Sequence, residues 1–269
     1  MSIKLIAIDI DGTLLTPERT ISPNVQQTIQ TAKEKGVKIV LCTGRPLAGV
    51  RAYLKALNLE EKGDYVLTYN GALAQESDSG KVLAHHTMSM DDFYEIEEMS
   101  RKVGVHLHTT TIDAMYTANR DISAYTVREA FIVELPLKFR TVEEMDKDLT
   151  ISKMMMIDDP AILDAAVEKI PQWFKDKYTV LRSEPFFLEI LNKSASKGQA
   201  LKSLAEILHL EPAEIMAIGD NENDLDMIEY AGVGVAMGNA IPKVKEAANI
   251  ITDTNVNDGV ATVIQEYLS

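Results

Sequence analysis

Near its start the chain reads Ile6-Ala7-Ile8-Asp9-Ile10-Asp11-Gly12-Thr13, an apolar run with two aspartates at its end. The apolar residues from 3 to 10 are typical of a parallel β-strand that is covered on both faces. Carboxylates are seldom buried unless another group pairs with them or binds them. Because side chains alternate along a strand, Asp9 and Asp11 are expected to point to nearly the same side. They would do so at the strand's C-terminal end, where open parallel sheets bind ligands.

Strands and helices alternate after this first strand. Ser22-Pro23 predicts the start of a helix that ends at Gly36, with serine as the N-cap and proline at the first helical position. Further strands are expected at 37–42 and 65–69, the second closed by the turn signal Asn70-Gly71. This βαβαβ order indicates a parallel, right-handed, doubly wound sheet.

The same alternation returns after about residue 190. Helices are expected at 198–208 and 222–230, together with a last helix that ends at Tyr267 and that Asp258 can cap. The strands expected in this part lie at 214–219 and 232–236. These elements can extend the sheet of the first third.

The middle of the chain has a different pattern. The expected strands are 81–86, 105–110, 153–157, 178–181 and 186–191, and the expected helices are 91–103 and 160–170. Several of these strands alternate polar and apolar residues, which predicts an α+β insert with an exposed sheet face. The expected organisation is therefore an α/β core formed by residues 1–83 and 191–269, interrupted by an insert at 84–190.

Composition limits the classes of partner. Among 269 residues, 41 are acidic and 27 basic, and the net charge of −14 argues against broad binding to nucleic acid or to an anionic membrane. The single cysteine, Cys42, permits no intrachain disulfide and is interpreted as a core residue. The N-terminal stretch lacks the apolar region of a signal peptide, and no apolar run approaches the roughly 18 residues of a membrane span. A reducing cytoplasm is the expected location.

Polar groups follow three of the predicted core strands. They are Asp9 and Asp11, then Thr43-Gly44-Arg45, then Gly219-Asp220-Asn221-Glu222-Asn223-Asp224. Crowded carboxylates repel one another unless a cation compensates them, and Mg²⁺ prefers such oxygen ligands. The Thr43 hydroxyl, the amides of a helix expected after Gly44 and a lysine could bind a phosphate. An aspartate can act as a covalent nucleophile in phosphoryl transfer.

The motifs together resemble those of a known family. Asp9-Ile10-Asp11-Gly12-Thr13-Leu14 resembles the DxDGT(L/V) motif of the haloacid dehalogenase superfamily of phosphotransferases. Thr43-Gly44-Arg45 resembles its second motif, Lys197 its third, and the Gly219–Asp224 segment its fourth, GDxxND. The insert is similar to the type C2 α+β cap of the Cof-type branch. The wider pattern, including Tyr69-Asn70-Gly71-Ala72 and residues 117–123, is closest to the YidA-like sugar phosphatases, and the resemblance spans essentially the whole chain.

This resemblance implies a Rossmann-like core that carries out catalysis. Asp9 would be the nucleophile that becomes phosphorylated, and Asp11 would protonate the leaving oxygen and then take a proton from water. Asp9, the backbone carbonyl of Asp11, and Asp220 would hold Mg²⁺, with Asp224 supporting them from nearby. The expected cofactor is thus Mg²⁺.

The resemblance also implies how a substrate is bound. Thr43, Gly44 and Lys197 would bind the phosphoryl oxygens, and Asn223 would orient the nucleophile or the substrate. The cap would close over the substrate, exclude water and select the leaving group. The expected activity is Mg²⁺-dependent hydrolysis of a small phosphorylated metabolite, with sugar phosphates favoured, by a monomer or homodimer.

Several alternatives stay open at this point. A phosphomutase would use the same core, and a non-catalytic phospho-aspartate sensor would share the acidic pocket, the threonine and the lysine. Lys197 alone could be a solvated surface residue, and Arg45 could serve the structure or the substrate. Histidines on the cap strands are expected on an exposed face. The polar candidates for reading the substrate in the cap are Asn119, Arg120 and Arg182.

Overall fold

The computed structural model describes residues 2–268, which divide into two compact units. The core unit joins the residues up to Ala84 with those from Ser196 onward, and the inserted unit spans His85–Ala195. The start expected for the insert, residue 84, lies next to this division. The inserted unit ends five residues after the expected position 190, which lies within strand β11 (Phe187–Asn192) of that unit's sheet.

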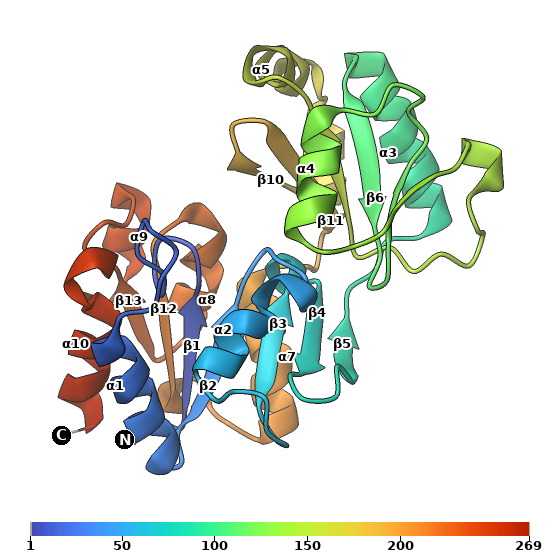
Figure 1. Cartoon of the computed structure of the whole chain (residues 1–269). Coiled ribbons are helices and arrows are strands. Elements are labelled where there is room, and N and C mark those ends of the chain that lie inside the picture. The colour runs from blue at the N-terminus through green and yellow to red at the C-terminus, as the bar shows by residue number, and fades with distance from the viewer. Residues whose placement is uncertain (1, 269) are drawn as a thin grey trace. The chain divides into compact units, whose positions relative to one another are not determined.

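Among the described residues, the core unit contains an eight-stranded sheet in the order β14-β13-β12-β1-β2-β3-β4-β5 (Figure 1). Its strands from β14 to β3 pair in parallel, and β4 turns back antiparallel to β3. β1 lies in the middle, between β12 and β2. The strands are β1 (Leu5–Asp9), β2 (Lys38–Cys42), β3 (Tyr65–Thr68), β4 (Leu73–Glu76), β5 (Val82–His85), β12 (Ile215–Gly219), β13 (Val233–Ala236) and β14 (Ile250–Ile251).

Two predictions for this sheet need correction. The strand expected at 81–86 as part of the middle segment pairs as β5 in the core sheet. β4 was not expected, although the turn at Asn70 and Gly71 that produces it was. The turn reverses the chain there because both residues adopt positive φ, 52° and 84°.

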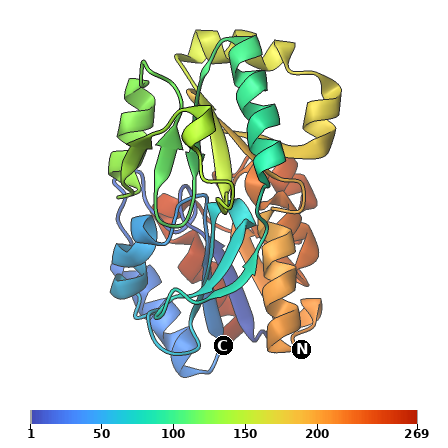
Figure 2. The same cartoon turned by 90° about the vertical axis from the view of Figure 1, so that its right-hand side faces the viewer.

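Helices cover both faces of the core sheet (Figures 1 and 2). α1 and α10 lie side by side on one face, joined by a hydrogen bond from Gln265 Nε2 to Thr28 Oγ1 at 2.7 Å. α7 and α8 lie on the other face, where the Gly198 amide donates to Asp226 Oδ2 at 2.9 Å. The helices of this unit are α1 (Pro23–Glu34), α2 (Arg51–Ala56), α7 (Lys197–Leu208), α8 (Leu225–Tyr230), α9 (Pro242–Ala247) and α10 (Gly259–Leu268).

The ends of three core helices can be compared with the caps predicted from the sequence. The Ser22 hydroxyl accepts a hydrogen bond from the Val25 amide at 3.1 Å, so α1 begins as predicted. The helix expected at 222–230 divides into a 3-10 turn, Glu222–Asp224, followed by α8. Asp258 precedes α10, but its side chain does not cap that helix. It instead accepts a hydrogen bond from Asn24 Nδ2 at 3.0 Å.

The inserted unit contains a six-stranded sheet in the order β10-β11-β9-β6-β7-β8. Its described strands are β6 (His106–Thr110), β7 (Met115–Thr117), β8 (Leu137–Phe139), β9 (Lys153–Ile157), β10 (Tyr178–Glu184) and β11. Its helices are α3 (Met90–Val103), α4 (Ala124–Ile132), α5 (Pro160–Lys169) and α6 (Gln172–Lys177). The sequence did not predict β7, α4, β8 or α6. The remaining elements match the expected α+β insert to within a few residues.

The second face of this sheet is buried, contrary to expectation. His108, Lys153 and Glu189 lie on that face and are at most 4% exposed. α4 covers them, and its Glu129 and the Glu189 of β11 each place a carboxylate oxygen 3.6 Å from Lys153 Nζ. The strands do alternate polar and apolar residues as predicted. The polar face is nevertheless buried, because the unpredicted helix α4 packs on it and places Glu129 opposite Lys153.

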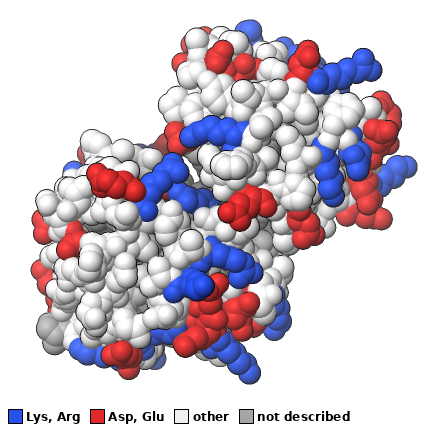
Figure 3. All heavy atoms as spheres, in the orientation of Figure 1, with Lys and Arg blue, Asp and Glu red and all other residues white. Residues whose placement is uncertain are grey.

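The surface shown in Figure 3 carries lysines and arginines interspersed with aspartates and glutamates. Among residues 2–268, every helix is too short or too polar to cross a lipid bilayer.

Candidate active site

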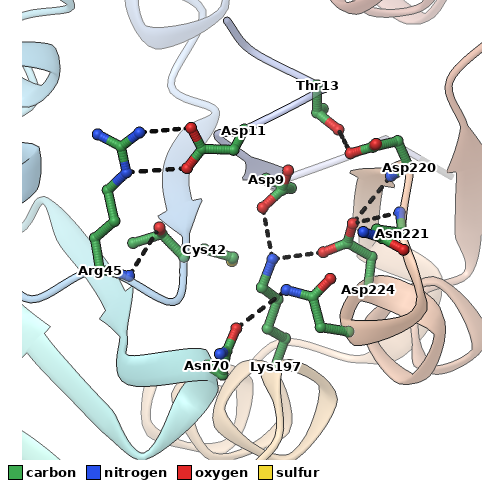
Figure 4. Close-up of polar contacts among 12 residues, drawn as sticks. Asp9, Asp11, Thr13, Cys42, Arg45, Asn70, Lys197, Asp220, Asn221 and Asp224 are labelled. Atoms are coloured by element: carbon green, nitrogen blue, oxygen red, sulfur yellow. Dashed lines mark hydrogen bonds and ion pairs between the residues drawn. The ribbon is translucent and has the colours of Figure 1, made fainter. Parts of the chain in front are cut away.

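The two aspartates that follow the first strand have different surroundings. β1 ends at the buried Asp9, and the chain leaves the sheet before Asp11. The Asp11 carboxylate is 54% exposed and faces the guanidinium of Arg45, with Nε 2.9 Å from Oδ2 and Nη2 2.5 Å from Oδ1. In Figure 4 the Asp9 carboxylate is directed at Lys197 instead. The two aspartates therefore pair with different basic side chains, because strand β1 ends at Asp9 and Asp11 lies in the loop that follows.

The ammonium group of Lys197 lies between the carboxylates of Asp9 and Asp224. Lys197 is the first residue of α7, and its side chain is completely buried. Nζ donates to Asp9 Oδ1 and to Asp224 Oδ1, both at 2.6 Å. Burial alone would lower the pKa of Lys197, but the two carboxylates outweigh burial and raise it. The ammonium therefore stays charged, and the alternative of a solvated surface lysine is wrong.

The loop after β12 supplies the other two carboxylates. Asp224 is completely buried, and its Oδ2 accepts hydrogen bonds from the amides of Asp220 at 2.9 Å and Asn221 at 3.1 Å. Because Oδ1 faces Lys197, the protein binds both oxygens of Asp224. Asp220 Oδ1 accepts a hydrogen bond from the Thr13 hydroxyl at 2.9 Å. Asp224 thus fixes the shape of the loop that presents Asp220.

The three carboxylates are too close to one another to be compensated by one ammonium. Asp9, Asp220 and Asp224 each place an oxygen within 4.8 Å of the others. Burial, together with the charge of Asp224, raises the pKa of Asp9 well above its usual range and that of Asp220 to about 6. When all three carboxylates are ionised, two negative charges remain after the charge of Lys197 is subtracted. A divalent cation with a preference for oxygen ligands, such as Mg²⁺, fits this donor set and this charge.

Thr43 and Gly44 lie at the end of β2, next to β1. Thr43 is buried, and its hydroxyl accepts a hydrogen bond from the Arg45 amide at 3.1 Å. The helix expected directly after Gly44 is wrong, because a 3-10 turn begins only at Ala48 and α2 at Arg51. Loop amides, rather than the first turn of a helix, therefore adjoin Thr43.

Asn70 is a residue of this site that the sequence did not single out for function. Its amide donates to the Thr43 carbonyl at 2.9 Å, and its side-chain Oδ1 accepts from Asn223 Nδ2 at 3.1 Å. A Cβ atom on Gly44 would approach Asn70 Nδ2 to 3.0 Å. Asn70 thus joins the second and fourth motifs. Its signals in the sequence were the turn dipeptide Asn70-Gly71 and the segment Tyr69-Asn70-Gly71-Ala72 within the family resemblance, and neither gave Asn70 a role.

The candidate residues of the inserted unit have structural partners. Asn119 Oδ1 accepts a hydrogen bond from the Leu107 amide at 2.8 Å, and Arg182 pairs with Asp164 at 2.9 Å. Arg120 lies with Asn119 on the wall of a surface cavity within that unit.

A sequence profile described as haloacid dehalogenase-like hydrolase matches residues 6–264. The chain belongs to this family. Nearly all of this hydrolase aligns with a Streptococcus pyogenes protein provisionally named a phosphatase, at 49% identity over 100% of this chain and 99% of the relative. A Bacillus subtilis protein, 5-amino-6-(5-phospho-D-ribitylamino)uracil phosphatase YcsE, is 33% identical over 100% of this chain and 97% of its own length.

Solved structures agree with this assignment. A haloacid dehalogenase-like hydrolase from Bacteroides thetaiotaomicron superposes with a TM-score of 0.86 at 32% identity, covering 98% of this chain and 99% of that one. The Rossmann-like α/β fold and the Cof-type family expected from the motifs are therefore confirmed. For this hydrolase, the comparisons point to a phosphatase.

Proposed function

We propose that this hydrolase is a Mg²⁺-dependent phosphatase that acts on small phosphorylated metabolites through an aspartyl phosphate on Asp9. The observation that carries the proposal is the contact of the buried Lys197 ammonium with Asp9 and Asp224. It fixes one carboxylate oxygen of Asp9 at the carboxyl end of β1. Packing alone does not require a buried lysine among three carboxylates.

Asp9 provides the nucleophile in this mechanism. One of its carboxylate oxygens attacks phosphorus, and the bond between phosphorus and the leaving oxygen breaks. Asp11 gives a proton to that leaving oxygen and, in the second step, takes a proton from the water that releases phosphate from Asp9. Lys197 lowers the pKa of Asp9 and so opposes the burial and the charge of Asp224, which raise that pKa.

Asp9, Asp220 and the backbone carbonyl of Asp11 would hold the magnesium ion, with Asp224 behind them. When bound, the ion supplies positive charge to the phosphoryl oxygens and to the crowded carboxylates. The Thr43 hydroxyl, the backbone at Gly44 and the Lys197 ammonium are the donors for the phosphoryl oxygens. Asn223 is held by Asn70 and would orient the nucleophile or the substrate.

Phosphorylated sugars and polyols are the proposed substrates. Three Bacillus subtilis relatives, at 31–33% identity, are named for the dephosphorylation of a ribitylamino uracil, whose phosphate is carried by a polyol chain. A sugar phosphorylated on its terminal CH₂OH group and the ribityl chain both present a primary alkyl phosphate to the nucleophile. We propose that the inserted unit acts as the cap that selects between such leaving groups.

The proposal is tested by measuring hydrolysis of p-nitrophenyl phosphate with and without MgCl₂. Activity should require Mg²⁺, disappear with EDTA, and fall by at least about a thousandfold in Asp9→Asn. Asp78→Asn, which neutralises an exposed aspartate in the turn before β5, is the matched control and should behave as the wild type. Intact activity in Asp9→Asn would show that Asp9 is not the nucleophile.

The substrate is tested with a panel of hexose, pentose and polyol phosphates that includes the phosphorylated ribitylamino uracil. Release of inorganic phosphate should be fastest with one group of these alkyl phosphates. Conversion of a hexose 1-phosphate into its 6-phosphate without release of phosphate would instead identify a phosphomutase.

A further inference from the structure

Among the described residues, the side-chain partner of the Asp11 carboxylate is Arg45, which binds it through two hydrogen bonds. Its Nε and Nη2 each donate to a different carboxylate oxygen, at 2.9 and 2.5 Å. Figure 4 shows the guanidinium and the carboxylate facing each other edge to edge. A paired fork of this kind fixes the plane of the carboxylate as well as its position.

The Arg45 side chain is itself held in place. It is only 18% exposed, and its guanidinium lies 5.5 Å from the centre of the Tyr53 ring. Its backbone is held at both ends, since the amide donates to Thr43 Oγ1 and the carbonyl accepts from the Tyr69 amide at 3.2 Å. The Arg45 side chain is therefore held in one position by its neighbours. The Asp11 side chain is 54% exposed, and Arg45 is what fixes the orientation of its carboxylate.

This arrangement contributes little to folding. A single, partly exposed ion pair adds little to stability, because solvent screens the charges and the two side chains lose conformational freedom. An exposed carboxylate held by a largely buried arginine is useful where the orientation of that carboxylate matters. In this site, Asp11 is the carboxylate with open access to water.

We propose that Arg45 is a positioning residue that orients Asp11 as the base for hydrolysis of the phosphorylated Asp9, an inference that rests on the proposed function. In that step the water oxygen bonds to phosphorus as the bond from phosphorus to the Asp9 oxygen breaks, and its electron pair returns to Asp9. The proton of the water passes to Asp11. Arg45 uses one lone-pair position on each Asp11 oxygen, which leaves the others to accept this proton.

The test is steady-state and rapid-mixing kinetics of Arg45→Lys with p-nitrophenyl phosphate and MgCl₂. Lysine keeps the charge but cannot form the bidentate pair. Because p-nitrophenolate leaves without a proton, formation of the phosphorylated enzyme should be unchanged and its hydrolysis slowed by about tenfold or more. We expect kcat and KM to fall together, kcat/KM to stay within about twofold of wild type, and a burst approaching one p-nitrophenolate per enzyme.

The matched control is Arg51→Lys, which alters an exposed arginine paired with Glu60 at 3.4 Å in the same unit. It should show neither the burst nor the change in kcat. Asp11→Asn provides the reference for a missing base and should also accumulate phosphorylated enzyme, measured by acid quenching with radiolabelled acetyl phosphate.

Other outcomes for Arg45→Lys would overturn the inference. A higher KM at unchanged kcat would make Arg45 a substrate-binding residue, and a loss of kcat/KM without a burst would place it in the first step. Faster turnover would mean that the pair restrains Asp11, and unchanged kinetics would give Arg45 no part in the reaction. A wild-type enzyme and an Asp11→Asn variant that never form a phosphorylated enzyme would refute the proposed function itself.

Discussion

The ammonium of Lys197 and the carboxylate of Asp224 lie 2.6 Å apart, and neither side chain exposes any surface to solvent. Removing one partner from a buried ion pair leaves the other charge without compensation, which costs about 3–5 kcal/mol. Lys197 also compensates Asp9, so its loss would leave three neighbouring carboxylates without a cation.

Lys197→Met is therefore expected to lower the free energy of unfolding by about 3 kcal/mol in the absence of Mg²⁺. The methionine fills the space of the lysine stem but supplies no charge. Urea unfolding followed by circular dichroism measures this difference. Lys243→Met, which removes an exposed lysine paired with Glu222, is the control and should unfold nearly as the wild type. Equal stability of Lys197→Met and wild type would contradict the electrostatic account of this site.

Mg²⁺ itself should stabilise the protein. A ligand that binds only the folded state adds about 1.4 kcal/mol to the free energy of unfolding at ten times its Kd. Thermal unfolding with increasing MgCl₂, at constant ionic strength set with NaCl, should show a rising Tm in the wild type. Asp220→Asn keeps an oxygen for the Thr13 hydroxyl but loses one ligand charge, so most of the rise should vanish. A full rise in that variant would exclude Asp220 as a ligand.

Gly12 controls how closely the first motif approaches Asp220. Its φ is 87°, and a Cβ atom would lie 2.5 Å from Asp220 Oδ2. Gly12→Ala should thus displace Asp220, lower the response of Tm to MgCl₂ and reduce hydrolysis by more than about tenfold.

Gly36 offers a matched comparison for this substitution. Its φ is 86°, but a Cβ atom there would meet nothing within 4 Å. Gly36→Ala should therefore cost about 1–2 kcal/mol of backbone strain and leave both Mg²⁺ binding and activity unchanged. If Gly12→Ala showed only that strain, close packing against Asp220 would not be required.

The order of strands and helices in the core unit was predictable because its central strands are uninterrupted apolar runs. Such runs need cover on both faces, and the helices between them carry clear caps such as Ser22. α4 escaped prediction for the opposite reason. It buries Thr126 and Glu129 and exposes Val127 and Phe131, so its polarity is the reverse of an ordinary amphipathic helix.

The candidate site likewise contains residues that the sequence predicted and contacts that it did not. Three of the four motifs could be located from the sequence, because each lies at or just after the end of a core strand and the ends of parallel strands meet at one edge. Lys197, at the start of α7, was assigned from the family resemblance. The pairing of Asp11 with Arg45 and the link from Asn70 to Asn223 could not be predicted. Both depend on loop conformations, including the left-handed φ of 52° at Asn70, which sequence periodicity does not encode.

His108 should make the inserted unit sensitive to acid. Burial and, to a smaller extent, the charge of Lys153 lower the pKa of His108 to about 3, below its ordinary value of 6.5. Between these two values the unfolded chain binds a proton that the folded protein does not, so the free energy of unfolding falls as the pH decreases. The loss is about 1.4 kcal/mol per pH unit below 6.5, and no loss is expected above that pH.

His108→Gln removes the titrating group, so the difference in unfolding free energy between the wild type and this variant should change in the variant's favour as the pH is lowered from 7 to 5. Urea unfolding at each pH measures the difference, and comparison at equal pH removes the effect of titrating carboxylates common to both proteins. His209→Asn replaces an exposed histidine with φ of 54°, a conformation that asparagine tolerates, and should follow the wild type throughout. A pH-independent difference for His108→Gln would mean that His108 accepts a proton in the folded state as readily as in the unfolded chain.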